Sequence, residues 1–408
     1  MPTLDLDRLT AAVSPGGPSC LSSTTELQPA GGLHSAIAPA KYTGKDARGN
    51  DVGSYAYEQR FLDGALRHTV LVDSKQSQLN RVEQTLQAAL DDGQSPWNRL
   101  PHLRVMYGAD SYTDLTLPHR AYDGHLRAGT VDRQPTTQHP LYRALRDATP
   151  LNARPLLEAS PVTLVFGGWD ASRRARQGRW RSALVGEVIG FLAGNPDDRR
   201  PEPSMRGGAR VDPVGMQVQL DGKAMQAMVE AQRDEISTGL YDKAVRAAKK
   251  ATSDKPESAS MLGLGGIPPS LDQLAGVACD RIIRTHVLSF ATLRQMRFGA
   301  GPDGDAACRA LLAALGLAGL AMADAELFLR ANCDLVEAGP TQVRLDQRGG
   351  EMLDLDPLSL EEANALLIGA LAQAEVLAEV DWHGLVLDVV GNPAVVRGAV
   401  ADEGDGAA

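Results

Sequence analysis

The pattern of apolar and polar residues predicts a strand followed by a helix near the start of the chain. Leu66–Val72 is a strand-like run rich in β-branched and apolar residues. Asp73 follows as an expected helix N-cap, with Gln76 three residues later as its capping-box partner. Apolar residues then recur at helical spacing, at Leu79, Val82, Leu86 and Leu90. Gly93 is expected to end this helix.

Further elements complete an α+β pattern. Cys20–Glu26 and Leu385–Val390 are predicted strands, and the short apolar run Val162–Phe166 is predicted to be a buried strand. Asp305–Arg330 is an Ala- and Leu-rich helix or helix pair. Ser359 opens another helix, because Glu362 completes a Ser-x-x-Glu capping box.

Two long segments lack clear periodicity and are predicted to be insertions. Residues 93–160 are rich in Pro, Gly, His and Arg, and a loop of this length in a compact domain is usually functional or a subdomain. Residues 194–260 form the second predicted insertion. We expect one elaborated domain over residues 1–408, with a disordered tail at 402–408.

Charge is distributed unevenly along the chain. The net charge is −10, but residues 301–408 hold 19 acidic residues against 5 Arg and no Lys, a net of −14. The remaining 32 acidic and 36 basic residues give residues 1–300 a net charge of +4. Phosphate binding depends on local potential, so the acidic total does not exclude a nucleic-acid partner. We expect the acidic, helical part at 301–400 to face away from such a partner.

The strand–helix junction at 73–83 is a candidate phosphate-binding site. The first turn of the helix offers Ser74, Lys75, Gln76 and Ser77, and free backbone N–H groups point toward the same end. Asn80 and Arg81 follow about one turn later. An ordinary capped amphipathic helix would show the same local features.

The segment 111–123 contains His119, Arg120 and Asp123, which resemble a catalytic or metal-binding cluster. No second His lies three to five residues away, so a structural His–Asp pair or an RNA-contacting loop is the preferred interpretation.

The segment 162–181 carries the strongest electrostatic signal. Residues 171–181 contain five Arg and no acidic residue. The planar guanidinium group donates paired hydrogen bonds to phosphate, which makes this loop a candidate clamp. Trp169 and Trp180 bracket the loop and are candidates for stacking on bases.

Other classes of function find little support in the sequence. The four cysteines form no CxxC pair, and no cofactor fingerprint or metal-ligand spacing is present. The first residues show no signal peptide, so a cytoplasmic location is expected. Aromatic residues make up 4% of the chain, which favours a groove that follows the backbone over an aromatic base-stacking sheet.

Six stretches together resemble the Csb-one family, the Cas seven-type backbone (RAMP) subunit of subtype I-G, formerly I-U, CRISPR Cascade effectors. Their order resembles the family from about residue 19 to about residue 390. The stretches are Ala38–Tyr42, Val70–Glu83, Pro118–Asp123, Leu164–Asp170, Arg181–Gly190 and Arg210–Pro213.

The resemblance implies a ferredoxin-like (RRM-type) palm with large insertions called fingers, web and thumb. It implies a non-catalytic subunit that oligomerises along the guide RNA (crRNA) as a helical filament in antiviral defence. The implied partners are crRNA, target DNA paired with the guide, further copies of the chain, a large subunit, a fused guide-capping and guide-processing subunit, and a recruited helicase-nuclease. No cofactor is expected.

The predicted RNA-binding residues come from the resembling stretches and the Arg-rich loop. They are Lys41, Tyr42, Ser74, Lys75, Gln76, Ser77, Asn80, Arg81, His119, Arg120, Trp169, Arg173, Arg174, Arg176, Arg179, Arg181 and Arg210.

Two other functions remain open at this stage. One is a metal-dependent endoribonuclease of the same superfamily, with Asp114, Asp123 and Asp170 as candidate catalytic residues. The other is a small-molecule enzyme, which no cofactor-binding motif in the sequence supports.

Overall fold

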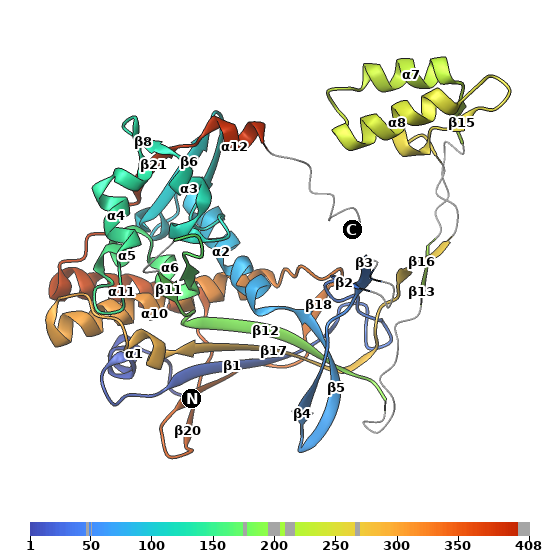
Figure 1. The fold of residues 1–408 in the computed structure, drawn as a ribbon. Coiled ribbons are helices and arrows are strands. Elements are labelled where there is room, and N and C mark those ends of the chain that lie inside the picture. Colours follow the sequence, from blue (N-terminus) through green and yellow to red (C-terminus); the bar gives the residue numbers. More distant parts are fainter. Residues whose placement is uncertain are drawn as a thin grey trace. The chain divides into compact units, whose positions relative to one another are not determined.

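The computed structural model describes residues 1–45, 49, 51–173, 178–194, 205–208, 217–265 and 270–398. The chain divides into two compact units. The larger comprises Met1–Pro201 and Gly276–Gly398, and the smaller contains Glu202–Ala275. Figure 1 shows both units.

The larger unit is built on an eight-stranded sheet. Its order is β20 (Met352–Leu355), β19 (Gln342–Asp346), β1 (Cys20–Pro29), β17 (Cys279–Ser289), β12 (Leu184–Leu192), β5 (Ala65–Asp73) and β4 (Tyr57–Leu62), and β18 (Leu335–Glu337) also pairs with β1.

The four strands β19, β1, β17 and β12 have the order of a ferredoxin-like sheet. In chain order they are the fourth, first, third and second strands, and each neighbouring pair is antiparallel. The strands β17 and β19 therefore run parallel on either side of β1, joined by a connection that contains α10 (Gly301–Glu326). The fold is α+β, as expected.

Three helices stack together in this unit. The helices α10, α2 (Lys75–Asp91) and α11 (Leu360–Ala378) contact one another through α10, and Figure 1 shows α10 and α11 running side by side. Gly319 allows α10 to approach α2 closely, because a Cβ there would lie 2.9 Å from Cγ1 of Val82. The helix α10 is long and apolar enough to cross a membrane, but 83% of its most apolar window is buried inside the protein.

The region 93–160 contains more regular structure than the sequence suggested. It contributes β6 (His102–Tyr107), β7 (Asp110–Thr113), β8 (Thr130–Val131) and β9 (Gln134–Pro135), which join β21 (Leu385–Val390) in a five-stranded sheet. The helices α3 (Gly124–Ala128), α4 (Pro140–Arg146) and α5 (Arg154–Ala159) follow between and after these strands. Much of this region is therefore regular structure rather than loops, and its elements are too short to show a period in the sequence.

Two local predictions were also wrong. Val162–Phe166 is not a strand: it lies in the helix α6 (Pro161–Phe166), which has Pro161 in its first turn and ends at Gly167 with φ +89°. A short apolar run that is buried on all sides shows no period that separates helix from strand. The N-cap of α2 is Ser74 rather than Asp73, and the Ser74 hydroxyl accepts a hydrogen bond from the Ser77 N–H.

Other predicted elements were confirmed. The strands β1, β5 and β21 cover the predicted ranges, α10 is one long helix, and α11 begins with the complete capping box of Ser359 and Glu362. The tail 402–408 lies outside the described residues.

The smaller unit has its own apolar core. The helices α7 (Gly222–Ala231) and α8 (Thr238–Lys250) pack on each other through buried residues that include Met225, Val229, Ala244 and Ala248. The ribbon β14 (Gln219–Leu220) with β15 (Glu257–Ser258) and the ribbon β13 (Met205–Gly208) with β16 (Ser270–Leu274) also belong to this unit.

A buried polar chain joins the sheet to the start of α2. His286 on β17 contacts Gln78 with 3.2 Å between Nε2 and Oε1, and Gln78 donates to the buried Asp73 carboxylate at 2.5 Å. Burial lowers the pKa of His286 to about 3, so the ring is neutral at pH 7. Gly186 lies opposite His286 across the β12–β17 pair, and any Cβ at Gly186 would overlap the imidazole ring.

This close packing predicts the effect of filling the space at position 186. Gly186→Ala should lower the free energy of unfolding by about 1–3 kcal/mol in a urea titration, because the added methyl group overpacks a filled site. The matched control is Gly339→Ala, where no atom lies within 4 Å of the new methyl group. A His286→Ala background should remove much of the Gly186→Ala penalty, and strictly additive effects would contradict the assignment to the imidazole.

Candidate nucleic-acid interface

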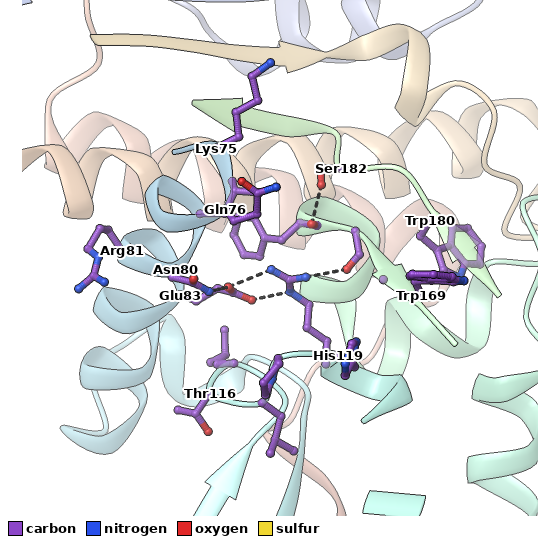
Figure 2. Close-up of a pocket in the computed structure, with 18 of the residues that line it drawn as sticks. Lys75, Gln76, Asn80, Arg81, Glu83, Thr116, His119, Trp169, Trp180 and Ser182 are labelled. Atoms are coloured by element: carbon purple, nitrogen blue, oxygen red, sulfur yellow. Dashed lines mark hydrogen bonds and ion pairs between the residues drawn. The ribbon is translucent and has the colours of Figure 1, made fainter. Parts of the chain in front are cut away.

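Three segments that lie far apart in the sequence line one open groove of about 780 Å³ in the larger unit. They are the first turns of α2, the turn at residues 115–120 and the two stretches 166–169 and 180–182, which form the third segment, and the close-up in Figure 2 shows them around one space. The predicted residues that line this groove are Lys75, Gln76, Asn80, Arg81, His119, Arg120 and Trp169.

The first turn of α2 presents polar groups to this groove. Lys75, Gln76 and Asn80 are exposed. By helix geometry the N–H groups of Lys75 and Gln76 have no acceptor within the helix. Ser77 is buried with 6% exposure, and the Ser74 hydroxyl caps the helix, so the structure places these two hydroxyl groups in the fold rather than in the groove.

Arg81 lies at the margin of the groove. Figure 2 shows its side chain on the side of α2 away from Trp169. It donates to Gln84 at 2.7 Å, and its guanidinium carbon lies 5.1 Å from the centre of the Phe328 ring. Arg81 therefore lies at the edge of the groove and does not reach across it in this conformation.

A buried ion pair forms the floor of the groove. Arg120 donates to both carboxylate oxygens of Glu83, at 2.5 and 2.9 Å, and donates through Nη1 to the carbonyl of Gly167 at 3.0 Å. The two side chains are 13% and 3% exposed. One guanidinium group therefore connects all three segments, and its charge is compensated within the protein.

The hydrogen-bond partners of Glu83 favour its charged form, which burial disfavours. Burial raises the pKa of Glu83, while the charge and hydrogen bonds of Arg120 and a hydrogen bond from Asn80 act in the opposite direction. The Asn80 amide donates to the Glu83 carboxylate at 3.2 Å. Arg120 itself has φ +49°, a strained backbone conformation for a non-glycine residue. The turn holds this conformation while presenting the guanidinium group to Glu83.

The turn that carries His119 is fixed by a buried carboxylate. Asp123 is 3% exposed and accepts hydrogen bonds from the N–H groups of His119 at 3.1 Å and His125 at 2.9 Å. His119 itself is exposed and lines the groove. The His–Asp proximity seen in the sequence is therefore a backbone contact in the structure.

A short ribbon carries the two tryptophans. In it, β10 (Gly168–Trp169) pairs with β11 (Arg179–Trp180). Trp180 is 7% exposed and donates from Nε1 to the hydroxyl of Tyr122 at 2.6 Å. The prediction that Trp180 stacks on bases is wrong for this reason. Trp169 is 46% exposed, and the guanidinium carbon of Arg179 lies 4.6 Å from its ring centre.

The other predicted residues that the structure describes do not line the groove. Arg173 donates to Asp147 at 2.6 Å and to the carbonyl of Arg146 at 3.0 Å. Arg181 is exposed and lines a separate hollow with Thr292 and Gln295. The segment before Lys41 and Tyr42 lies against β5, because the Ala40 N–H donates to the Val72 carbonyl. Arg174, Arg176 and Arg210 lie outside the described residues.

Sequence reasoning missed the group that organises the groove. Glu83 stood in the resembling stretch without a role, although it follows Leu79 by four residues and precedes Leu86 by three, on the apolar side of α2. A carboxylate on the buried side of a helix requires a partner, and this was the available signal. The contact of Arg120 with the Gly167 carbonyl could not be predicted in this way, because every residue carries a backbone carbonyl.

Metal binding finds no support among the residues that the structure describes, which contain no group of three or more His, Cys, Asp or Glu arranged to hold an ion. The carboxylates proposed for a nuclease are all buried: Asp114 is 0% exposed, Asp123 3% and Asp170 4%. Burial raises the pKa of Asp114 to about 7, and its partners are the Ser160 hydroxyl and the Leu103 N–H.

The fold and the groove together define an α+β protein with a ferredoxin-like sheet and a polar groove beside it. Residues 21–194 match the family model described as CRISPR-associated protein GSU0053. The matched region contains β1 except its first residue, all of α2 and β12, and the residues of all three segments that line the groove. Over these residues the chain is similar to a CRISPR-associated family. No curated protein matches the chain.

The buried ion pair predicts a pH-dependent effect of removing Arg120. Arg120→Ala should lower the free energy of unfolding at pH 7 by about 3–5 kcal/mol, because it leaves the Glu83 carboxylate buried and unpaired. Without Arg120 the pKa of Glu83 rises further, so the folded state binds a proton more readily than the unfolded state. Stability is then retained below the unfolded pKa and lost as the pH rises through the folded value.

Urea titrations at pH 5 and pH 7 would measure this effect. The penalty of Arg120→Ala should be smaller at pH 5, and Glu83→Gln in the same background should remove much of the difference between the two pH values. Equal penalties at both pH values would show that the pair contributes through packing alone.

Proposed function

We propose that this chain is a non-catalytic subunit that binds CRISPR guide RNA and repeats along it. The observation that carries the proposal is the convergence of three sequence segments on one groove. Each segment lies within the region that matches the CRISPR-associated family. A CRISPR-associated protein works with nucleic acid, and this groove joins helix N–H groups, amide side chains and an exposed indole on one surface.

The chemistry of the groove suits a phosphate backbone better than a small anion. Lys75 is exposed at the mouth of the groove, and the free N–H groups of the first turn lie beside it. The Arg120 charge is already matched by Glu83, so the groove offers scattered donors rather than one concentrated positive centre. Such an arrangement contacts successive phosphates and sugars along a strand.

The burial of the candidate nuclease residues supports a role without catalysis. Each of Asp114, Asp123 and Asp170 accepts hydrogen bonds from groups inside the fold or pairs with Arg127. A carboxylate that binds a catalytic metal must turn an oxygen toward the ion at a place that the substrate can reach. We therefore propose that target cleavage belongs to another component, the helicase-nuclease expected from the resemblance.

The remaining partners follow from the same proposal. Further copies of the chain would bind head to tail along the guide, which pairs with target DNA, and a large subunit and a fused guide-capping and guide-processing subunit would complete the complex. A head-to-tail arrangement that does not close gives a filament whose length follows the RNA.

RNA binding is tested by a double substitution with a charge-matched control. Lys75→Ala combined with Arg81→Ala should weaken binding to single-stranded RNA in filter-binding titrations and lower the slope of log K against log salt by about 0.7 for each phosphate that is no longer bound. The control, Arg143→Ala with Arg397→Ala, removes two exposed cations that do not line the groove. Equal affinities and slopes for both variants would assign RNA binding to another surface.

Assembly is tested by the length of the RNA. The number of bound copies, measured by size exclusion with light scattering, should rise when the RNA is lengthened and fall at high salt if charged groups join neighbouring copies. A copy number that stays constant on longer RNA would replace the filament with a closed oligomer.

A further inference from the structure

A second hollow lies directly beside the groove. It has a volume of about 360 Å³ and is lined by the 118–127 segment together with Trp169, Ala171 and Ser172. Pro118, His119 and Trp169 line both hollows. These three residues therefore form a ridge between two spaces, both within the range of about 300–1,000 Å³ that is usual for small-ligand sites.

The aromatic side chains of the ridge stand out from the surface. Trp169 is 46% exposed and His119 is also exposed, while Trp97, Trp180 and Trp382 are 2%, 7% and 3% exposed. Figure 2 shows Trp169 across the groove from Asn80 and Glu83, with His119 on the same side of the groove as Thr116. Of the four tryptophans, Trp169 therefore has an indole ring that a ligand can reach, and the other three are buried.

The backbone beneath the ridge is held in place on both sides. Gly168 is pressed onto Tyr122, where a Cβ would lie 3.2 Å from the ring, and the Asp170 N–H donates to the Gly178 carbonyl at 3.0 Å. Arg179 covers one face of the Trp169 ring from the paired strand. On the other side, the Asp123 carboxylate holds the His119 turn. A preorganised platform of this kind loses little conformational freedom when a flat ligand binds.

We propose that a single strand of RNA crosses this ridge, with one unpaired base stacked on Trp169 and its neighbouring nucleotides in separate hollows. This inference rests on the proposed function and adds the mode of recognition. Bases in a duplex are stacked and paired, so their faces are not available to an indole ring, whereas a single strand can separate two bases across a ridge. Stacking on an aromatic ring tolerates every base, which suits a subunit that must accept any guide sequence.

The experiment uses the intrinsic fluorescence of the full-length protein with three RNA probes of equal length. The probes are single-stranded oligouridine, the same strand with abasic residues, and a duplex. Oligouridine should quench the emission of Trp169, because the other three tryptophans are buried, while the abasic strand should bind with little quenching. Trp169→Phe provides the background emission.

Affinities then separate base stacking from phosphate binding. Trp169→Ala should bind oligouridine about 5- to 150-fold more weakly than the parent, the range expected for removing one base–aromatic stack. Its affinity for the abasic strand should be unchanged, and Trp169→Phe should restore most of the difference. The control is Phe61→Ala, which removes a 75% exposed aromatic ring on β4 that lines neither hollow.

The outcomes distinguish this inference from the proposed function. If the parent binds none of the three probes, the proposed function is wrong and the inference falls with it. If the parent binds RNA but Trp169→Ala binds oligouridine equally well, or if the abasic strand quenches as strongly as oligouridine, RNA binding stands and the stacking ridge is wrong. A Trp169→Ala variant that loses only self-association would instead make the ridge a protein interface, which also overturns the inference.

Discussion

The buried pair of Glu83 and Arg120 is the interaction on which the candidate interface depends. The guanidinium group of Arg120 joins three segments that are far apart in the sequence. They are the helix α2, the strained turn of Arg120 itself and the end of the short apolar helix α6. Burying two charges is costly, so a pair of this kind contributes to stability only when its hydrogen bonds are complete. Here they are complete on the Glu83 side, because Asn80 supplies a further donor. The pair therefore fixes the shape of the groove, but adds little net charge to it, because the two charges compensate each other.

A related arrangement fixes the sheet side of the same helix. The neutral His286, the amide of Gln78 and the carboxylate of Asp73 connect β17, α2 and β5 in sequence. Gly186 makes room for the imidazole ring on the neighbouring strand. The first turns of α2 are consequently held by polar contacts on two sides, which keeps Lys75, Gln76 and Asn80 in a constant position relative to the groove.

The sequence predicted the parts of the fold that carry a strong local signal. The β-branched and apolar strand before α2, the capping box at Ser359 and the long Ala- and Leu-rich helix each carry such a signal. Val162–Phe166 was predicted to be a strand because a run of five residues, four of them apolar, shows no period that separates strand from helix; Pro161, which fits the first turn of a helix, was the better signal. Of the predicted RNA-binding residues, Lys75, Gln76, Asn80, Arg81, His119, Arg120 and Trp169 meet in one place. Their grouping depends on contacts between distant segments, and local spacing cannot reveal such contacts.

The placement of the smaller unit has a consequence for how this chain can vary. Leu192 and Cys279 are paired residues on neighbouring strands, so everything between them occupies the position of a hairpin loop. The unit with α7 and α8 has its own core and makes up most of that loop. The pairing of β12 with β17 is set by their own residues and by the contact of Gly186 with His286, whatever the loop contains. Evolution can therefore lengthen, shorten or exchange this module while the register of the central sheet, and the groove beside it, stay the same.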